Sequence, residues 1–172
     1  MTIYRTRTYL AADWTGDEDA IKELHKWNDS KHWGLSFTDA HDLMQANDTS
    51  LNCTIKDSLR KRIQASKTFV LIVGNQTRGL RSGSCQYCNR YNSWTQHCAK
   101  GYTVDYRSYV DYECDKSIED GIKLVILYNA TSVDKSKCPE VLKNIGIHVS
   151  MLHYEGGKKE WDYLAVKEAI EN

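Results

Sequence analysis

The stretch Phe69-Val70-Leu71-Ile72-Val73, closed by Gly74, decides the fold of this chain. A short unbroken apolar run that ends at a turn residue is the pattern of a parallel strand buried on both faces. A second run of this kind, Leu-Val-Ile-Leu-Tyr, occupies residues 124–128. Two such strands predict a central parallel sheet with helices packed on both of its faces.

Outside these two strands, apolar runs alternate with helical patterns along the whole chain, which is typical of βαβ units. Asp17 is expected to cap the first helix, and Thr54 with Asp57 has the spacing of a capping box at the second. Right-handed crossovers predict an α/β, flavodoxin-like, doubly wound parallel five-stranded sheet with strand order 2-1-3-4-5. The remaining strands are expected at residues 9–12, 33–38 and 147–152, and the helices at residues 17–28, 54–66, 106–120 and 161–169.

The composition favours one domain over residues 1–172, with a long cysteine-bearing insert at about residues 75–105. A single proline and scattered glycines leave no linker at which the chain would divide. Basic and acidic residues are equal in number, so no net field attracts nucleic acid or an anionic membrane. No apolar run approaches the length of a membrane span. We therefore expect a cytoplasmic protein with neither nucleic acid nor a membrane as partner.

The six cysteines raise the question of disulfides or a metal site. Disulfide scaffolds belong to short secreted chains, so free thiols or a partial metal site are the better interpretation. One C-x-x-C pair is a weak zinc signal, and its fourth ligand would have to be His97, Cys114 or a distant residue. We therefore expect no metal and no bound cofactor. The weak metal candidates are Cys85, Cys88, His97 and Cys98.

Sites in doubly wound sheets form at the carboxyl ends of the strands, here near residues 13–14, 39, 74–77 and 129. Neither a phosphate-binding P-loop nor a dinucleotide fingerprint follows the first strand. A phosphate-accepting receiver would need paired carboxylates there, and the sequence offers only Asp13. The sequence therefore excludes a P-loop and a Rossmann dinucleotide site, and it disfavours a phosphate-accepting receiver.

Three blocks have the order found in bacterial TIR-like domains. They are Tyr9-Leu10-Ala11-Ala12-Asp13-Trp14, residues 55–74, and Tyr109-Val110-Asp111-Tyr112-Glu113-Cys114 ahead of residues 124–126. Over nearly its whole length the chain resembles this family, and most closely the branch that includes the Thoeris antiphage sensors. The resemblance implies either a signalling module that assembles or an enzyme that cleaves NAD to nicotinamide and an ADP-ribose product.

In the enzymatic members, a glutamate on the helix after the third strand follows an aromatic residue four positions earlier. The matching residues are Glu113 and Tyr109, with Tyr106 one turn further back. A carboxylate there would hold the ribose hydroxyls and balance the charge of an oxocarbenium-like transition state. The resemblance thus implies a catalytic role for Glu113. The alternative is a solvated helical glutamate paired with Lys116.

Further substrate contacts are expected at the ends of the first and third strands. Asp13 would contact ribose, and the alternative is that it only forms a turn. Trp14 would stack on a base, and the alternative is that it packs in the core. After the third strand, backbone amides and a guanidinium would bind a pyrophosphate. The alternative is that these groups are only solvated. The residues concerned there are Asn75, Thr77 and Arg78.

Three functions remain open at this point. The first is cleavage or cyclisation of NAD into a nucleotide signal during antiphage or stress signalling. The second is a non-catalytic interaction module that self-associates or binds an effector protein, with the long polar loop at residues 39–52 as its contact surface. The third is a protein that only binds a small nucleotide.

Overall fold

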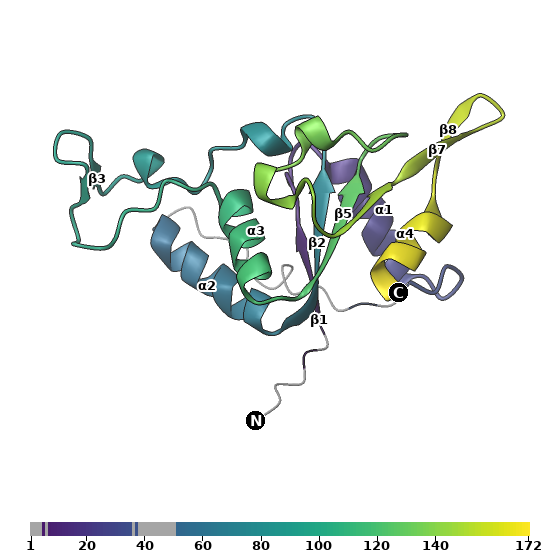
Figure 1. Cartoon of the computed structure of the whole chain (residues 1–172), viewed down its shortest axis with the longest axis horizontal. Coiled ribbons are helices and arrows are strands. Elements are labelled where there is room, and N and C mark those ends of the chain that lie inside the picture. Colours follow the sequence, from purple (N-terminus) through teal and green to yellow (C-terminus); the bar gives the residue numbers. More distant parts are fainter. Residues whose placement is uncertain (1–4, 6, 36, 38–50) are drawn as a thin grey trace.

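The computed structural model describes residues 5, 7–35, 37 and 51–172, and its centre is a four-stranded sheet. The strand order is β1-β2-β5-β6, and all three neighbouring pairs are parallel (Figure 1). The α/β class and the parallel sheet are therefore as predicted. The strands are β1 (Arg7–Ala11), β2 (Ser66–Val73), β5 (Lys123–Tyr128) and β6 (Ile147–Ser150).

Four helices cover the two faces of this sheet (Figure 1). Alternate side chains of each strand point to opposite faces, so Tyr9 and Leu10 lie in different cores. The core with Tyr9 is closed by α2 (Asn52–Gln64) and α3 (Tyr109–Glu119). The core with Leu10 is closed by α1 (Glu18–Asp29) and α4 (Tyr163–Glu171). Residues 69–73 are at most 2% exposed, as expected for a strand covered on both faces.

The strand expected at residues 33–38 is not formed by the described residues 33–35 and 37. Their backbone amides bond back toward the end of α1 instead: Gly34 N–H donates to Ser30 O and Phe37 N–H donates to Asn28 Oδ1. Because these amides are satisfied locally, they are not available to pair with β1. The five-stranded order is therefore replaced, over the described residues, by four strands. Of the contact loop expected at residues 39–52, residues 39–50 lie outside the described residues.

Three helix starts also differ from the prediction. The second helix begins at Asn52 after Leu51, so the capping box expected at residues 54 and 57 is wrong. Asp17 precedes α1 without making a side-chain cap bond. The third helix begins only after Ser108, whose hydroxyl accepts the Asp111 N–H at 3.1 Å. Tyr106 therefore lies before the helix and does not share a face with Glu113.

Residues 81–106, here called the arm, extend away from the sheet (Figure 1). The arm carries one 3₁₀ turn, η2 (Cys85–Tyr87), and a hairpin of two-residue strands, β3 (Tyr91–Asn92) and β4 (His97–Cys98). Two further 3₁₀ turns, η3 (Lys135–Lys137) and η4 (Glu140–Leu142), precede β6. A second hairpin, β7 (Leu152–Glu155) and β8 (Lys158–Trp161), precedes α4.

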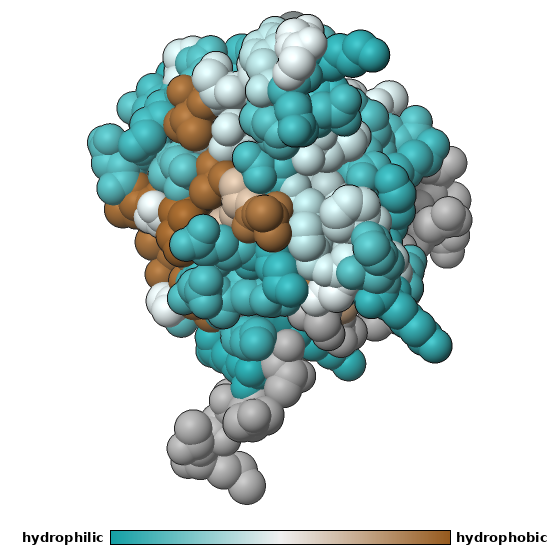
Figure 2. Space-filling view, turned by 90° about the vertical axis from the view of Figure 1, so that its right-hand side faces the viewer, coloured by the Kyte–Doolittle hydropathy of each residue, from teal (hydrophilic) through white to brown (hydrophobic). Residues whose placement is uncertain are grey.

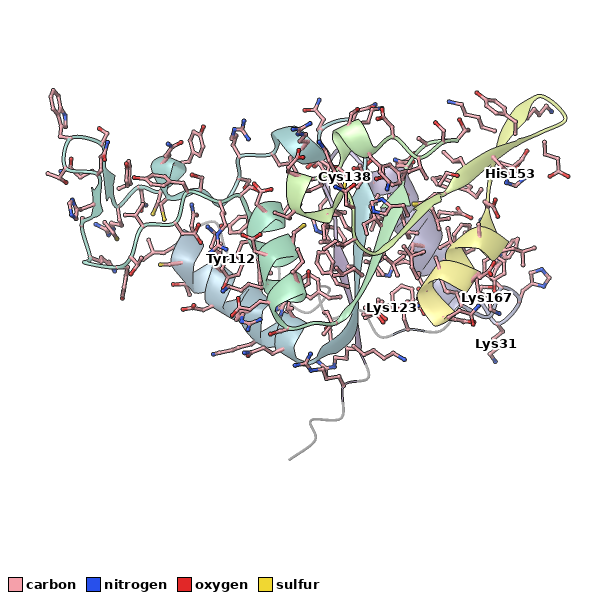
Figure 3. All side chains as sticks on the ribbon, viewed as in Figure 1. Lys31, Tyr112, Lys123, Cys138, His153 and Lys167 are labelled. Atoms are coloured by element: carbon pink, nitrogen blue, oxygen red, sulfur yellow. The ribbon has the colours of Figure 1, made fainter. Side chains whose placement is uncertain are left out.

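An ionic network fastens the end of the arm to α2 and α3. Lys56, which is only 4% exposed, approaches Asp105 to 3.3 Å and donates to Arg107 O at 2.8 Å. Burial by itself would raise the pKa of Asp105, but the Arg107 hydrogen bonds and the charge of Lys56 lower it to about 2. The guanidinium of Arg107 also lies over the ring of Tyr112, a residue labelled in Figure 3.

The surface around α4 and the β7–β8 hairpin mixes apolar and hydrophilic residues (Figure 2). Leu164 on α4 is 75% exposed, so this helix buries only the side that carries Val166, Ala169 and Ile170. None of the helices within residues 7–35 and 51–172 has the length and apolar character needed to cross a membrane.

Candidate functional site

Glu113, the predicted catalytic residue, is buried in the core between α3 and β1. Its side chain is 3% exposed, and the hydroxyl of Tyr9 donates a hydrogen bond to Oε1. Tyr9 lies in the middle of β1 and is fully buried. The solvated alternative is wrong, because Lys116 pairs with Glu119 at 2.6 Å instead.

Burial determines the protonation state of this carboxyl. Loss of solvation raises the pKa of Glu113 to about 8, and the hydrogen bond from Tyr9 offsets part of that rise. At neutral pH most of the molecules therefore carry a protonated Glu113. A carboxyl with a pKa near the operating pH is suited to holding or releasing a proton during a reaction.

Tyr109 is covered by the start of the arm. Gly83 has a φ of +97°, and a Cβ at this position would stand 2.6 Å from the Tyr109 ring. Ser82 O accepts the Tyr109 N–H at 2.7 Å, and the Tyr109 hydroxyl donates to Asn52 Oδ1 at 3.1 Å. The chain at residues 82–83 thus closes over the beginning of α3, on the same helix face as Glu113.

The carboxyl edge of the sheet gathers a polar cluster that we call the edge cluster, made of Asp13, Asp17, Gly74, Thr77 and Asn129. Asp13 forms a turn in which its carboxylate accepts the Thr15 N–H at 3.2 Å. Thr77 accepts the Gly74 N–H through its hydroxyl oxygen at 2.8 Å. Asp13 and Thr77 were predicted to lie at this edge, and they do. Trp14 follows Asp13 and is 37% exposed.

Asp17 is the member of the edge cluster that sequence reasoning missed, because it was interpreted as a helix cap. Its buried carboxylate accepts a hydrogen bond from Asn129 Nδ2 at 2.9 Å and packs directly on Gly74. Burial raises the pKa of Asp17, against the hydrogen bond from Asn129. A polar residue directly after a buried strand, as Asn129 is after β5, is the signal that points to this edge.

The other two predicted phosphate contacts are already engaged. Lys137 Nζ donates to Asn75 Oδ1 at 2.7 Å. The guanidinium of Arg78 donates to Ser136 O at 3.1 Å and pairs with Glu140 at 3.2 Å. Both residues therefore connect the end of β2 to the segment around η3 and η4, and both are exposed.

Gly74→Ala is expected to destabilise the protein by about 1–3 kcal/mol, because the new Cβ would stand 2.0 Å from the Asp17 carboxylate and displace it from Asn129. Urea unfolding at neutral pH measures the effect. Gly79→Ala is the matched control, since no atom lies within 4 Å of its Cβ position, and its effect should stay within about 0.5 kcal/mol. Equal midpoints for the two variants would contradict the close packing of Asp17 on Gly74.

The six thiols fall into two groups. Cys114 and Cys138 are buried in the core of the domain, and Figure 3 places Cys138 at the edge of the sheet, away from the arm. Cys85, Cys88 and Cys98 line one cavity together with Cys53. His97 is exposed and contacts Thr95 O. Of the four weak metal candidates, three therefore come together and His97 does not.

Residues 9–82 match the family model of the TIR-like domain of the Thoeris protein ThsB. The predicted resemblance is confirmed over this segment, which ends before Glu113. No curated protein matches the chain.

Solved structures with similar folds include two enzymes and one designed protein. A CMP N-glycosidase from Clostridium botulinum has a TM-score of 0.47 at 11% identity, over 96% of this chain and 98% of its own. A 2-deoxyribosyltransferase from Bacillus psychrosaccharolyticus scores 0.48 at 12% identity, over 94% and 90%. A de novo designed Rossmann 2x3 protein scores 0.43 at 12% identity, over 98% and 87%.

Proposed function

We propose, from the match of residues 9–82 to the TIR-like domain of the Thoeris protein ThsB, that this protein cleaves NAD and releases a nucleotide signal. The match supports a TIR-like signalling role. Cleavage of NAD to nicotinamide and an ADP-ribose product, linear or cyclised, is the activity that we assign to that role.

The observation that carries the proposal is the buried carboxyl of Glu113 with its raised pKa. Burying a carboxyl costs stability, and strongly perturbed carboxyls concentrate at functional sites. Glu113 also holds the position that the resemblance assigns to the catalytic glutamate. A glutamate exposed on the surface of a helix would be neither buried nor raised in pKa.

In the proposed reaction the bond between the nicotinamide nitrogen and C1 of the ribose breaks. The bonding electrons leave with nicotinamide, whose nitrogen loses its positive charge, and the ribose becomes an oxocarbenium-like cation. Ionised Glu113 balances this cation and accepts hydrogen bonds from the ribose hydroxyls, while the Tyr9 hydroxyl fixes the orientation of the carboxylate. Water, or an atom of the adenine, then adds to C1 and releases a proton.

We assign the remaining substrate contacts to residues that follow β1 and β2. In this assignment Asp13 and Trp14 meet ribose and base, and Asn75, Thr77 and Arg78 meet the phosphates after Asn75 and Arg78 release Lys137, Ser136 and Glu140. Residues 82–83 pack on Tyr109, one turn before the buried Glu113 on α3. We propose that this contact opens on oligomerisation or on a trigger, so that NAD reaches Glu113.

The rate of nicotinamide release is expected to rise with pH and to level off above about pH 8. Glu113 must be ionised to balance the transition state, and burial keeps it protonated below its pKa of about 8. The measurement is a pH series of nicotinamide release from NAD by the purified protein, with and without a crowding agent that promotes assembly.

A flat profile between pH 6 and about pH 9 would contradict the role of a high-pKa carboxylate. Intact NAD after long incubation, in both the free and the assembled protein, would contradict NAD cleavage itself. The fold and the match over residues 9–82 are unaffected by either result.

A second candidate function, a non-catalytic interaction module, is favoured by the aromatic side chains of the arm. Trp94 is 95% exposed and Tyr87 is 65% exposed. Exposed aromatic residues on a projecting segment are typical of protein contact surfaces. This function predicts concentration-dependent association that Trp94→Ala abolishes, together with intact NAD.

A further inference from the structure

Four cysteines from three separate segments line one small cavity at the base of the arm. Cys53 lies in the first turn of α2, Cys85 and Cys88 bracket the η2 turn, and Cys98 belongs to β4. Thirty-five or more positions separate Cys88 and Cys98 from Cys53, so this convergence is a product of the fold. All four thiols are free and half-buried.

The size of the cavity fits a single ion. Its volume is about 10 Å³, which is about the space that one water molecule needs. The lining is almost entirely apolar, so a water molecule there would lack the two to four polar partners that buried waters have. The lining does suit a metal ion, because the sulfur atoms of its cysteines become good ligands for a soft metal when they ionise to thiolates.

The backbone around Cys85 and Cys88 has the compact form of half a zinc site. Cys88 N–H donates to Cys85 O at 3.0 Å, which brings the two thiols of the C-x-x-C pair onto one turn. Asp105 N–H donates to Cys85 Sγ at 3.3 Å. Such N–H donors around a ligating sulfur stabilise its thiolate form.

The hairpin that brings in Cys98 follows directly from this turn. Tyr91 N–H donates to Cys88 O at 3.0 Å, and Tyr91 pairs with Cys98 across β3 and β4. The side of the cavity formed by α2 is tied to the turn as well, because Asn52 Nδ2 donates to Ser84 O at 3.0 Å. The three segments are therefore held around the cavity by their own backbone contacts.

Tyr109 connects α3 to the same place. Its hydroxyl donates to Asn52 Oδ1 at 3.1 Å, and Asn52 directly precedes Cys53.

The arm contains little hydrophobic packing of its own. Its strands are two residues long, and Tyr87, Trp94, Tyr102 and Tyr106 are all about half exposed or more. Short segments without a hydrophobic core are commonly stabilised by a structural metal. A tetrahedral ion bound at this point would connect the turn, the hairpin and α2.

We propose that Cys53, Cys85, Cys88 and Cys98 bind one Zn²⁺ ion that holds the arm against the start of α2. Four thiolates are the ligand set of closed structural zinc sites, and the four thiols release their protons to solvent as the ion binds. As the side chains stand, no three His, Cys, Asp or Glu groups within residues 7–35 and 51–172 are arranged to hold a metal ion. Binding therefore requires the thiols to rotate toward the cavity.

The zinc proposal does not rest on NAD cleavage, so it is tested by metal content and not by activity. The full chain, purified under reducing conditions and dialysed against metal-free buffer, is expected to contain one zinc per chain. Cys53→Ser and Cys88→Ser should each weaken zinc binding at least about tenfold. His97→Ala is the matched control, because His97 is the neighbour of Cys98 but does not line the cavity, and it should keep its zinc.

A second measurement covers the case in which the serine variants fail to fold. The wild-type chain, stripped of metal under reducing conditions, is titrated with Co²⁺, which gives the visible absorption of a tetrahedral thiolate complex when it occupies such a site. Added Zn²⁺ should displace the cobalt and protect four thiols from a thiol reagent. Zinc far below one per chain that Zn²⁺ does not restore, iron in its place, or a cobalt spectrum without thiolate bands would each overturn the proposal.

Discussion

Glu113→Gln is expected to lower the rate of nicotinamide release from NAD by at least about 100-fold. Glutamine keeps the size of the side chain and can still accept the hydrogen bond from the Tyr9 hydroxyl. It cannot carry the negative charge that balances the oxocarbenium-like transition state. The loss should therefore appear in the rate at saturating NAD, since only the transition state is affected.

The measurement compares wild type and Glu113→Gln by chromatographic detection of nicotinamide at about pH 8, near the pKa of Glu113. Glu119→Gln is the matched control on the same helix. Glu119 is exposed and pairs with Lys116 and Arg60 at the surface, so its replacement should leave the rate within about twofold. Full activity of Glu113→Gln with an intact circular dichroism spectrum would remove Glu113 from the reaction.

The stability of the wild-type protein is expected to fall as pH rises from about 4.5 to about 8, and Glu113 is the cause. In the unfolded chain this carboxyl ionises near its usual pKa of 4.5, whereas burial keeps it protonated in the folded chain up to about 8. Between these values the folded state holds one more proton than the unfolded state, so raising the pH favours unfolding. Below 4.5 both states are protonated and the penalty disappears.

Integrated to pH 7, this difference is on the order of 3 kcal/mol. Glu113→Gln has no titrating group at this position, so it should be more stable than wild type by about that amount at pH 7. At pH 4 the difference should be close to zero. Urea unfolding of both proteins across this pH range measures the effect, and parallel stability curves for the two would show that Glu113 is not the group responsible.

Glu113→Gln is thus expected to lower the rate of nicotinamide release and to raise the stability of the fold at neutral pH. A carboxyl that destabilises the fold at neutral pH is removed easily by mutation unless it has a function. Loss of activity combined with gain of stability in Glu113→Gln would therefore be the signature of a functional residue. Loss of both would indicate that Glu113 mainly supports the fold.

Much of the fold could be predicted from local pattern. The run at residues 69–73 and the run at residues 124–128 are central strands, and residues 69–73 and 125–128 are buried without a break, as in a strand covered on both faces. The helices were placed to within a few residues for a similar reason. Their apolar stripes recur at the helical period wherever one side faces the sheet.

The errors in the fold came from interactions that local pattern does not contain. Residues 33–35 and 37 are apolar enough for a strand, but their amides bond to the end of α1. Asp17 has the right residue type for a helix cap, but its carboxylate is engaged by Asn129, more than a hundred positions away. In both places a specific hydrogen bond outweighed a residue preference.

The sequence by itself determined the class of the sheet and most of the residues at its carboxyl edge, because period and turn residues are local properties, and its resemblance to TIR-like domains singled out Glu113. Only the tertiary structure decided that Glu113 is buried against Tyr9, and that Cys53 joins Cys85, Cys88 and Cys98. Solvation and pKa depend on every neighbour that surrounds a group, and a cavity exists only between segments that the chain has already brought together.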